Sequence, residues 1–319
     1  MLLVTGGMGF IGMHLVKSLL DAGESVVATW HNSWRVPEIW GDELGKRVIA
    51  ERLDVASTLD VLNLAKKHNV DGIIHLATPV VGTATPAQDF ATNMQGLVNV
   101  LEAARLVGAR RVTFASTSTL YSGLKAGPFR EDATLPLDSR SATEAFKKAG
   151  ETILFHYAER IGLSVAAVRP RQVYGPMYYS GINLPSRLCH AAIKGVEPDY
   201  GRTAQGPNPA PFAQDTSDFT FVKDCAEVLT LVHRAEKLQH RVYNVAGGRA
   251  VRMEEVVDAV KEMVPDAKIE LRPGSSPGND SQDAYLDLTR VKEEFGFTPR
   301  FPVERGIPEY LNWLRTHEL

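Results

Sequence analysis

The chain has 319 residues, 44% of them hydrophobic, and a formal net charge of -3 with charges of both signs scattered along its length. A chain of this length and composition buries a sizeable core, as one large α/β domain or two closely joined domains. The composition excludes the concentrated basic face that nucleic acid or an anionic membrane requires, so we expect a small-molecule partner.

The first half of the chain alternates short apolar runs with amphipathic stretches. Such alternation predicts βαβ units and a parallel sheet covered on both faces. Strands are expected at 1–5, 25–30, 47–55, 72–78, 110–116 and 164–170. Helices are expected at 14–23, 59–69, 98–108 and 141–162. We therefore predict an α/β fold with a doubly wound parallel sheet of the Rossmann type over residues 1–170.

The pattern loosens after residue 170. Residues 200–218 are rich in Pro, Gly and polar side chains and predict a long loop, a candidate lid over a substrate. Short strands are expected around RVYNVAGG and KIELRPG, and helices at MEEVVDAVKEMV and VERGIPEYLNWLRTHE. Residues 171–319 are therefore predicted to form a smaller α+β substrate lobe, with a strand and helix near 219–235 returning to the first domain.

The sequence carries no signature of a metal site or a membrane span. Its two cysteines, Cys189 and Cys225, lie far apart and lack zinc-ligand spacing, so we expect two buried thiols. No window approaches the ~20 apolar residues of a membrane-spanning helix, and no basic leader precedes the first apolar run. We expect a cytoplasmic protein.

A glycine motif ends the first predicted strand. The segment TGGMGFIG, residues 5–12, places Gly6, Gly9 and Gly12 in the spacing GxxGxxG, with Phe10 and Ile11 among them. One glycine allows a tight turn, one lets the backbone approach a pyrophosphate, and one lets the helix pack close to the sheet. Three glycines at a strand-to-helix junction predict a dinucleotide-binding loop.

Eight further motifs are spread over nearly the whole chain. They are LDV at 53–55, HLAT at 75–78, NMQGLVNVLEAAR at 93–105, STSTLYSG at 116–123, KKAGE at 147–151, RPRQVYGP at 169–176, DFTFVKDCAE at 218–227 and YNVAGG at 243–248. With the glycine motif, they resemble the extended short-chain dehydrogenase/reductase superfamily, in particular the NAD-dependent epimerase/dehydratase group typified by UDP-galactose 4-epimerase. The resemblance implies an enzyme of hydride transfer, and a homodimer joined through the helices within 93–108 and 141–162.

The same resemblance implies the rest of the cofactor site. In such proteins the aspartate that matches Asp54 binds the adenine, the segment around Ala77 lies along the dinucleotide, and the asparagine that matches Asn93 supports the cofactor. Beside the glycine loop, the expected set is Asp54, Val55, Leu76, Ala77, Thr78, Asn93, Lys147 and Pro170.

The end of the second strand departs from the family. An acidic residue is expected there to accept hydrogen bonds from the adenosine ribose, but the chain has Trp30 followed by HNSWR. His31, Asn32 or Ser33 can supply neutral hydrogen bonds instead, and Arg35 is either solvated or able to pair with a 2'-phosphate. We favour NAD, with NADP left open.

The larger departure is Thr143, which stands four residues before Lys147 where the family has a catalytic tyrosine. A phenol beside a lysine can exchange a proton near the working pH, whereas an aliphatic hydroxyl is a far weaker acid. Thr117 matches the family's serine or threonine hydroxyl. We expect Thr117 and Lys147 to polarise the substrate oxygen and hold the cofactor, and Thr143 to bind without transferring the proton.

Three explanations of the missing phenol stay open. In the first, a tyrosine from a nearby loop replaces it, with Tyr121, Tyr174, Tyr178 and Tyr179 as the candidates. In the second, a substrate group, water or another residue such as Glu144 or His190 handles the proton. In the third, catalysis is lost and the protein is a dinucleotide-binding regulator or scaffold. We favour an active enzyme.

The substrate side of the sequence is only partly similar to sugar-nucleotide epimerases. Asn183 and Arg272 resemble residues that contact a nucleotide diphosphate there, and Tyr178 and Thr117 are further candidates for substrate contact. The arginine expected just before Asp218 is Ser217. For Asn183, a helix N-cap is an equally good interpretation. A sugar nucleotide and a smaller hydroxy or keto compound both remain open, and dehydration is disfavoured because STSTLY lacks an Asp-Glu pair.

Overall fold

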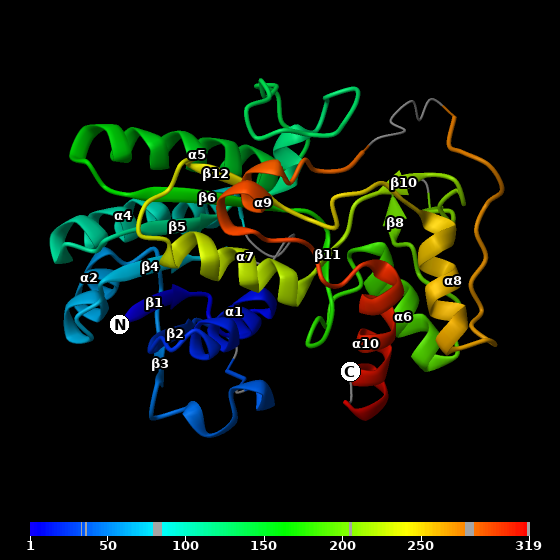
Figure 1. Cartoon of the computed structure of the whole chain (residues 1–319), viewed down its shortest axis with the longest axis horizontal. Helices are drawn as coiled ribbons and strands as arrows, with labels where there is room; N and C mark the ends of the chain where they lie inside the picture. Colours follow the sequence, from blue (N-terminus) through cyan, green and yellow to red (C-terminus); the bar gives the residue numbers. More distant parts are fainter. Residues whose placement is uncertain (33, 36, 79–84, 204–205, 278–283, 318–319) are drawn as a thin grey trace.

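The computed structural model describes residues 1–32, 34–35, 37–78, 85–203, 206–277 and 284–317. Within these residues the largest sheet has seven strands, all parallel, in the order β12-β6-β5-β4-β1-β2-β3 (Figure 1). The strands are β1 (Leu2–Thr5), β2 (Val26–Trp30), β3 (Val48–Arg52), β4 (Gly72–His75), β5 (Val112–Ala115), β6 (Val165–Pro170) and β12 (Val242–Val245). The predicted α/β fold with a Rossmann-type parallel sheet is confirmed.

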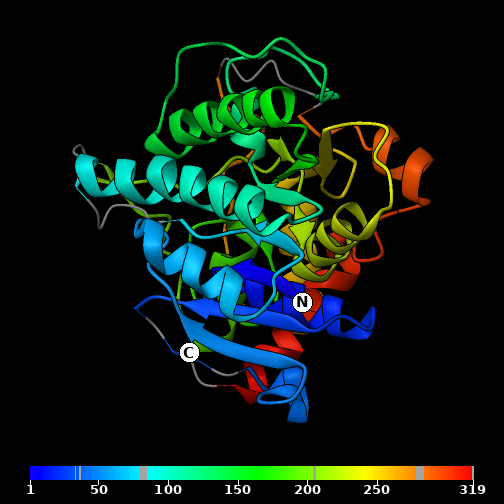
Figure 2. The ribbon, with the colours of Figure 1, turned by 90° about the vertical axis from the view of Figure 1, so that its left-hand side faces the viewer.

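Helices cover both faces of this sheet because side chains alternate along each strand (Figure 2). On β1, Leu2 and Val4 join the cluster under one pair of helices, whereas Leu3 joins the opposite cluster. The first pair is α1 (Phe10–Asp21) and α7 (Val222–Arg234). The opposite face carries α2 (Thr58–Lys67), α4 (Gly96–Val107) and α5 (Ala142–Ile161).

Short helical segments lie between these elements. They are η1 (Glu38–Glu43), α3 (Pro86–Phe90), the π-helical turn η2 (Ala91–Gln95) and η3 (Ser118–Tyr121). The Thr85 hydroxyl accepts from the Gln88 amide and the Gln88 side chain accepts from the Thr85 amide, so a capping box begins α3. The π-helical turn continues directly into α4, the form in which π-helix usually occurs and often a mark of functional sites.

The C-terminal lobe packs three helices around its own apolar cluster, at the right of Figure 1. They are α6 (Leu184–Lys194), α8 (Met253–Met263) and α10 (Val303–Thr316). Short strands also pair outside the main sheet: β7 (Val173–Tyr174) with β11 (Thr220–Phe221), β10 (Thr216–Ser217) with β13 (Val251–Arg252), and β8 (Arg202–Thr203) with β9 (Gly206–Pro207). The remaining helix, α9 (Thr289–Phe295), lies against β12.

Three segments differ from the sequence predictions. The strand in RVYNVAGG belongs to the edge of the main sheet, not to the lobe, because β12 pairs with β6. KIELRPG contributes an isolated bridge at Arg272, and the long loop at 200–218 contains short strands. The predicted strand near 219–223 is β11, which pairs with β7 outside the main sheet, while α7 returns to the sheet domain.

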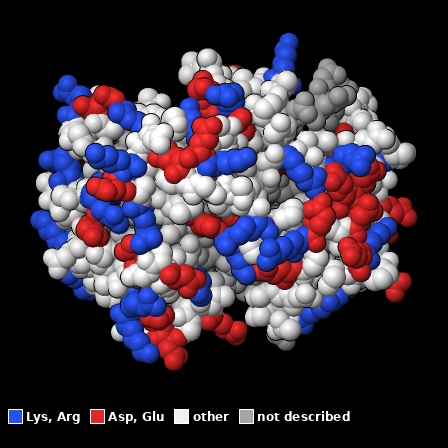
Figure 3. All heavy atoms as spheres, in the orientation of Figure 1, with Lys and Arg blue, Asp and Glu red and all other residues white. Residues whose placement is uncertain are grey.

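Surface charge and buried thiols follow the composition. Basic and acidic side chains interleave over the face shown in Figure 3. Cys225 is buried under α7 and Cys189 in the core of the lobe. No helix in the described part of the chain is long and apolar enough to cross a membrane. Those residues also contain no group of three or more His, Cys, Asp or Glu that could hold a metal ion.

Candidate functional site

The predicted cofactor segments meet where the strand order reverses. The chain runs outward from β1 to β3 on one side and from β4 to β12 on the other. Ligands of doubly wound sheets bind beyond the carboxyl ends of the strands at this point. The glycine loop follows β1, and Leu76–Thr78 follows the adjacent β4. Thr5 joins them, since its hydroxyl oxygen accepts from the amides of Leu76 and Ala77 at 3.2 and 3.3 Å.

The glycine loop is packed so closely that side chains do not fit. A Cβ on Gly12 would lie 2.2 Å from the Gly6 carbonyl oxygen, and Gly6 itself has a positive φ of 68° beside the backbone of Ala77. Gly9 caps α1 with extended backbone, and the first turn of α1, which includes Phe10 and Ile11, contains no acidic residue. The unpaired amides of a helix N-terminus therefore open toward this loop, which fits a pyrophosphate.

The adenosine side contains exposed polar residues. Asp54 is exposed and its carboxylate accepts from the Ala56 amide at 2.9 Å, while Val55 is buried beneath it. His31 and Asn32 are both exposed after β2, where they can reach a ribose. Ser33 lies outside the described residues. No carboxylate stands at the end of β2, because Trp30 occupies its last position.

The nicotinamide side is bordered by the segment after β4 and by the π-helical turn. The exposed Thr78 hydroxyl donates to Asn93 Oδ1 at 3.3 Å, and Asn93 Nδ2 donates to the Asp89 carbonyl at 2.8 Å. Pro170, half-buried, ends β6 on the same edge of the sheet. Asn93 thus holds the segment that lies along the expected dinucleotide.

Thr117 and Lys147 lie together at the carboxyl end of β5. Thr117 caps η3 by accepting from the Thr119 amide at 3.2 Å. Lys147, on α5, is 7% exposed; its Nζ donates to the Ala115 carbonyl at 2.6 Å and lies 4.4 Å from the centre of the Phe114 ring. Burial lowers the pKa of Lys147 to about 8, which Glu151 partly opposes. The site therefore holds an amine that can change protonation near neutral pH.

Thr143 lies exposed on the first turn of α5, one turn before Lys147. Its neighbour Glu144 is buried and already bound, because it accepts from the Arg140 amide and from Lys148 Nζ. Burial acts to raise the pKa of Glu144, but these hydrogen bonds lower it overall. Glu144 is thus held ionised in a structural role at the start of α5.

Two of the candidate tyrosines are buried away from solvent. Tyr121 is 2% exposed; its hydroxyl donates to Asn244 and accepts from Arg169, both at 2.8 Å, and burial raises its pKa to about 12. Tyr174 is fully buried in the lobe core, edge-on to Phe221, and burial raises its pKa. Neither phenol is placed to exchange a proton with a ligand beside Lys147.

The other two tyrosines join the lobe to the cofactor loops. The Tyr178 ring stacks on Phe10 with centroids 4.4 Å apart, and the Arg35 guanidinium lies 4.0 Å from the centre of the Tyr179 ring. His190 contacts the Tyr178 carbonyl at 3.1 Å, and burial lowers its pKa. We call residues 177–180 the lobe strap. It joins α6 and α10 of the lobe to α1 and the loop after β2, which border the predicted adenosine and pyrophosphate half of the site.

The predicted diphosphate contacts have other partners. Asn183 caps α6, accepting from the Ser186 amide at 3.0 Å, and its Nδ2 donates to the Val173 carbonyl at 2.7 Å. Arg272 is exposed, donates to the Ala210 carbonyl at 2.6 Å and covers the Phe212 ring at 3.8 Å. For Asn183 the structure matches the N-cap interpretation, since both polar ends of its amide are used.

A buried polar network behind the site was missed from the sequence. Glu151 of α5 forms a two-pronged ion pair with Arg169 of β6 at 2.6 and 2.9 Å, and Arg169 also binds the Tyr121 hydroxyl. The signal that could have revealed it is a pair of opposite charges at buried positions of two motifs, Glu151 in KKAGE and Arg169 in RPRQVYGP. The network fixes α5 against the loop that carries Thr117.

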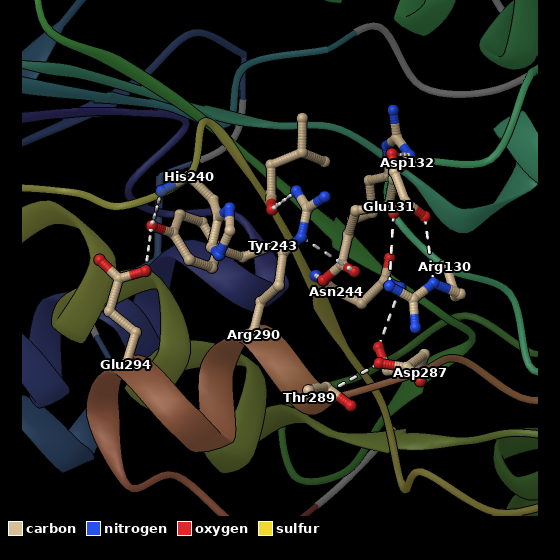
Figure 4. Close-up of polar contacts among 12 residues, drawn as sticks. Arg130, Glu131, Asp132, His240, Tyr243, Asn244, Asp287, Thr289, Arg290 and Glu294 are labelled. Atoms are coloured by element: carbon tan, nitrogen blue, oxygen red, sulfur yellow. Dashed lines mark hydrogen bonds and ion pairs between the residues drawn. The ribbon is translucent and has the colours of Figure 1, made fainter.

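Figure 4 shows how the network is held from the edge of the sheet. Asn244 of β12 accepts from Tyr121 through its side chain, and its backbone N–H donates to the Glu131 carboxylate at 2.9 Å. Arg290 of α9 lies 3.6 Å from the same carboxylate. Arg290 also donates to the Val242 carbonyl. Burial raises the pKa of Glu131. Helix α9 thus secures β12, and β12 secures η3, which follows Thr117.

Comparison with known proteins gives one consistent family. Residues 2–246 match the NAD dependent epimerase/dehydratase family. UDP-glucuronic acid decarboxylase 6 of Arabidopsis thaliana is 29% identical over 96% of this chain and 86% of its own length. UDP-N-acetyl-alpha-D-glucosaminuronate decarboxylase of Bacillus cytotoxicus is 29% identical over 99% of this chain and 98% of its own length. Among solved structures, MoeE5 in complex with UDP-glucose and NAD is 28% identical in sequence and superposes with a TM-score of 0.79. The match covers 99% of this chain and 98% of MoeE5.

Proposed function

Because the chain belongs to the NAD dependent epimerase/dehydratase family, we propose that it acts on a sugar nucleotide by oxidoreduction hidden within an epimerisation or related change. It is an NAD-dependent enzyme with the extended short-chain dehydrogenase/reductase fold. The observation that carries the proposal is the buried Lys147 amine, bound to the Ala115 carbonyl two residues before Thr117, at the edge where the predicted cofactor segments converge. The substrate class rests on the relatives, which are named for UDP-linked sugars.

The chain's own residues fit NAD, whose nicotinamide accepts and returns a hydride when bound. The glycine loop and the N-terminus of α1 hold the pyrophosphate. Asp54 and the neutral residues His31 and Asn32 face the adenosine, and Asn93 orders the segment beside the nicotinamide half. Arg35 is engaged by Tyr179 in place of a 2'-phosphate, which supports the preference for NAD over NADP.

Lys147 is the group we assign to proton transfer in place of the missing phenol. Oxidation of a carbinol releases a proton from oxygen as the hydride leaves carbon, and the neutral Lys147 amine accepts that proton. Thr117 accepts the Thr119 amide, which leaves its own proton to donate to the substrate oxygen. Thr143 binds the substrate from the first turn of α5. On the return step the carbonyl carbon would regain the hydride while Lys147 gives the proton back to oxygen, so the cofactor would be unchanged overall.

The test is turnover of UDP-sugars by purified protein loaded with NAD. UDP-glucose, UDP-N-acetylglucosamine and UDP-glucuronate are incubated with it, products are identified by NMR, and reduced nicotinamide is followed by its absorbance. We expect a changed sugar with no net cofactor consumption. Lys147→Met should lose activity by at least about 100-fold, the lower end of general acid–base contributions, while retaining its fold. Turnover of none of the three sugars by protein that binds NAD would contradict the proposal.

We also propose a homodimer through α4 and α5. Both helices expose apolar side chains, including Leu106 at 52% and Ile161 at 41% exposure. A helix pair of each copy would cover these residues as a four-helix bundle. Sedimentation of the wild type should give twice the chain mass, and Leu106→Glu should shift it to the monomer.

A further inference from the structure

Arg171 is a charged side chain in an unusual position. It follows β6 directly and is only partly exposed. Its Nε is buried and has no hydrogen-bond partner, and its guanidinium forms no ion pair with any residue that the structure describes. The guanidinium carbon lies 5.9 Å from the centre of the Phe129 ring.

The acidic group whose charge acts on Arg171 is Asp218, and it has hydrogen-bond partners of its own. Asp218 is buried and accepts from the amides of Gly247, Gly248 and Leu286 at 2.8, 3.2 and 3.0 Å. It influences Arg171 only through space: burial lowers the pKa of Arg171, and Asp218 partly opposes this. Because removing a charge from water without a partner is costly, a guanidinium held this way is explained if an anion binds it.

The position of Arg171 can be compared with that of Lys147. Glu151 and Lys147 are four residues apart on α5, about 6 Å along its axis. Arg171 lies one residue beyond the end of β6, and its amide continues the pairing with β12 by donating to the Val245 carbonyl at 3.3 Å. Arg169 and Arg171 are thus two residues apart on an extended backbone, also about 6 to 7 Å, and alternation places them on the same face of the sheet. Since Glu151 pairs with Arg169, and α5 runs antiparallel to the strands, Arg171 reaches the level of Lys147 at the carboxyl edge.

We propose that Arg171 binds a carboxylate on the sugar ring of the substrate, which makes the substrate a nucleotide-linked uronic acid. This inference rests on the proposed function. An anion at the level of Lys147 lies beside the reacting ring, whereas the diphosphate lies further along the substrate. The planar fork of a guanidinium matches a carboxylate with two parallel hydrogen bonds. A neutral hydroxymethyl group would leave the charge unpaired.

The experiment compares three ligands on NAD-loaded protein: UDP-glucuronate, UDP-glucose and UDP, with affinities measured by calorimetry. We expect the wild type to prefer UDP-glucuronate to UDP-glucose. Arg171→Gln should lower the affinity for UDP-glucuronate by about 10- to 100-fold, the range that corresponds to losing a hydrogen bond to a charged group. The affinities for UDP-glucose and UDP should stay nearly unchanged. Arg171→Lys, which keeps the charge but loses the fork, should be intermediate. Arg160→Gln, an exposed arginine of α5, is the matched control.

Other outcomes overturn the inference. If Arg171→Gln lowers the affinity for all three ligands equally, Arg171 binds the diphosphate. If none of the three affinities changes, Arg171 has no role in ligand binding. Melting curves and NAD content check the fold; if both Arg171 variants misfold, the wild-type preference between UDP-glucuronate and UDP-glucose decides. Turnover of UDP-glucose without that preference refutes only the carboxylate site, whereas turnover of no UDP-sugar refutes the proposed function.

Discussion

At the residue scale, Lys147 gives the enzyme a pH dependence. Burial lowers its pKa to about 8, so the amine is mostly protonated below this pH and accepts a proton only above it. For the oxidation direction, kcat/KM should therefore rise with pH, with a midpoint near pH 8, and level off above it. Lys147→Arg, which stays charged, should have a low kcat/KM at every pH and should not show the rise near pH 8. If the rise of kcat/KM near pH 8 persists in Lys147→Arg, the titrating group is a residue other than Lys147.

Thr143 should matter much less than the tyrosine it replaces. It is exposed and too weak an acid to supply the proton, so Thr143→Val should lower kcat by less than about tenfold. Thr117→Val removes the hydroxyl assigned to the substrate oxygen and should cost clearly more. Steady-state kinetics of both variants provides the comparison. Loss from Thr143→Val equal to that from Lys147→Met would show that the Thr143 hydroxyl takes part in proton transfer.

At the element scale, the start of α1 depends on Gly12. A methyl group there would lie 2.2 Å from the Gly6 carbonyl and 2.8 Å from Gly7 Cα, and backbone atoms cannot move aside cheaply. Gly12→Ala should lose NAD binding and about 1–3 kcal/mol of stability, typical of overpacking. Gly181→Ala is the control, since its nearest neighbour is at an ordinary 3.6 Å. Calorimetry with NAD and thermal unfolding measure the two effects.

The lobe strap should slow the release of NAD. Its contacts hold the lobe against α1 and the loop after β2, which border the proposed cofactor site, and an aromatic pair contributes about 0.5–1.5 kcal/mol. Tyr178→Ala should therefore speed NAD dissociation by up to about tenfold. Tyr178→Phe keeps the ring and should behave as the wild type. Stopped-flow displacement of bound NAD gives the rates, and identical rates in all three proteins would exclude a retaining role.

At the scale of the whole molecule, local signals predicted the fold and the tight glycine turn between β1 and α1, but not the contacts that arrange the site. Strands β1 to β6 are short apolar runs, and the glycine spacing is itself a backbone requirement, so both are visible in sequence. The pairing of β12 with β6 joins segments over 70 residues apart. The burial of Tyr121 depends on Arg169 and Asn244, which arrive from other strands. Such contacts leave no local pattern.

The joint between the two lobes should be acid-sensitive through His14. This residue of α1 is buried, and its Nε2 donates to the Pro176 carbonyl at 2.9 Å, beside the lobe strap. Burial lowers its pKa from 6.5 to about 4. The unfolded chain therefore takes up a proton below pH 6.5 that the folded chain refuses until about pH 4, so this residue's contribution to stability falls by up to about 1.4 kcal/mol per pH unit in that window.

His14→Gln isolates this effect from the groups that oppose it. Burial raises the pKa of Asp218 and of Asp224 to about 6, so those carboxyls favour the folded state as pH falls, and the total curve mixes both signs. Glutamine can donate the same hydrogen bond without titrating. The variant should be less stable than the wild type at neutral pH, and urea unfolding should show the difference shrinking between pH 6.5 and 4. A difference that stays constant with pH would mean that folding does not shift the pKa of His14.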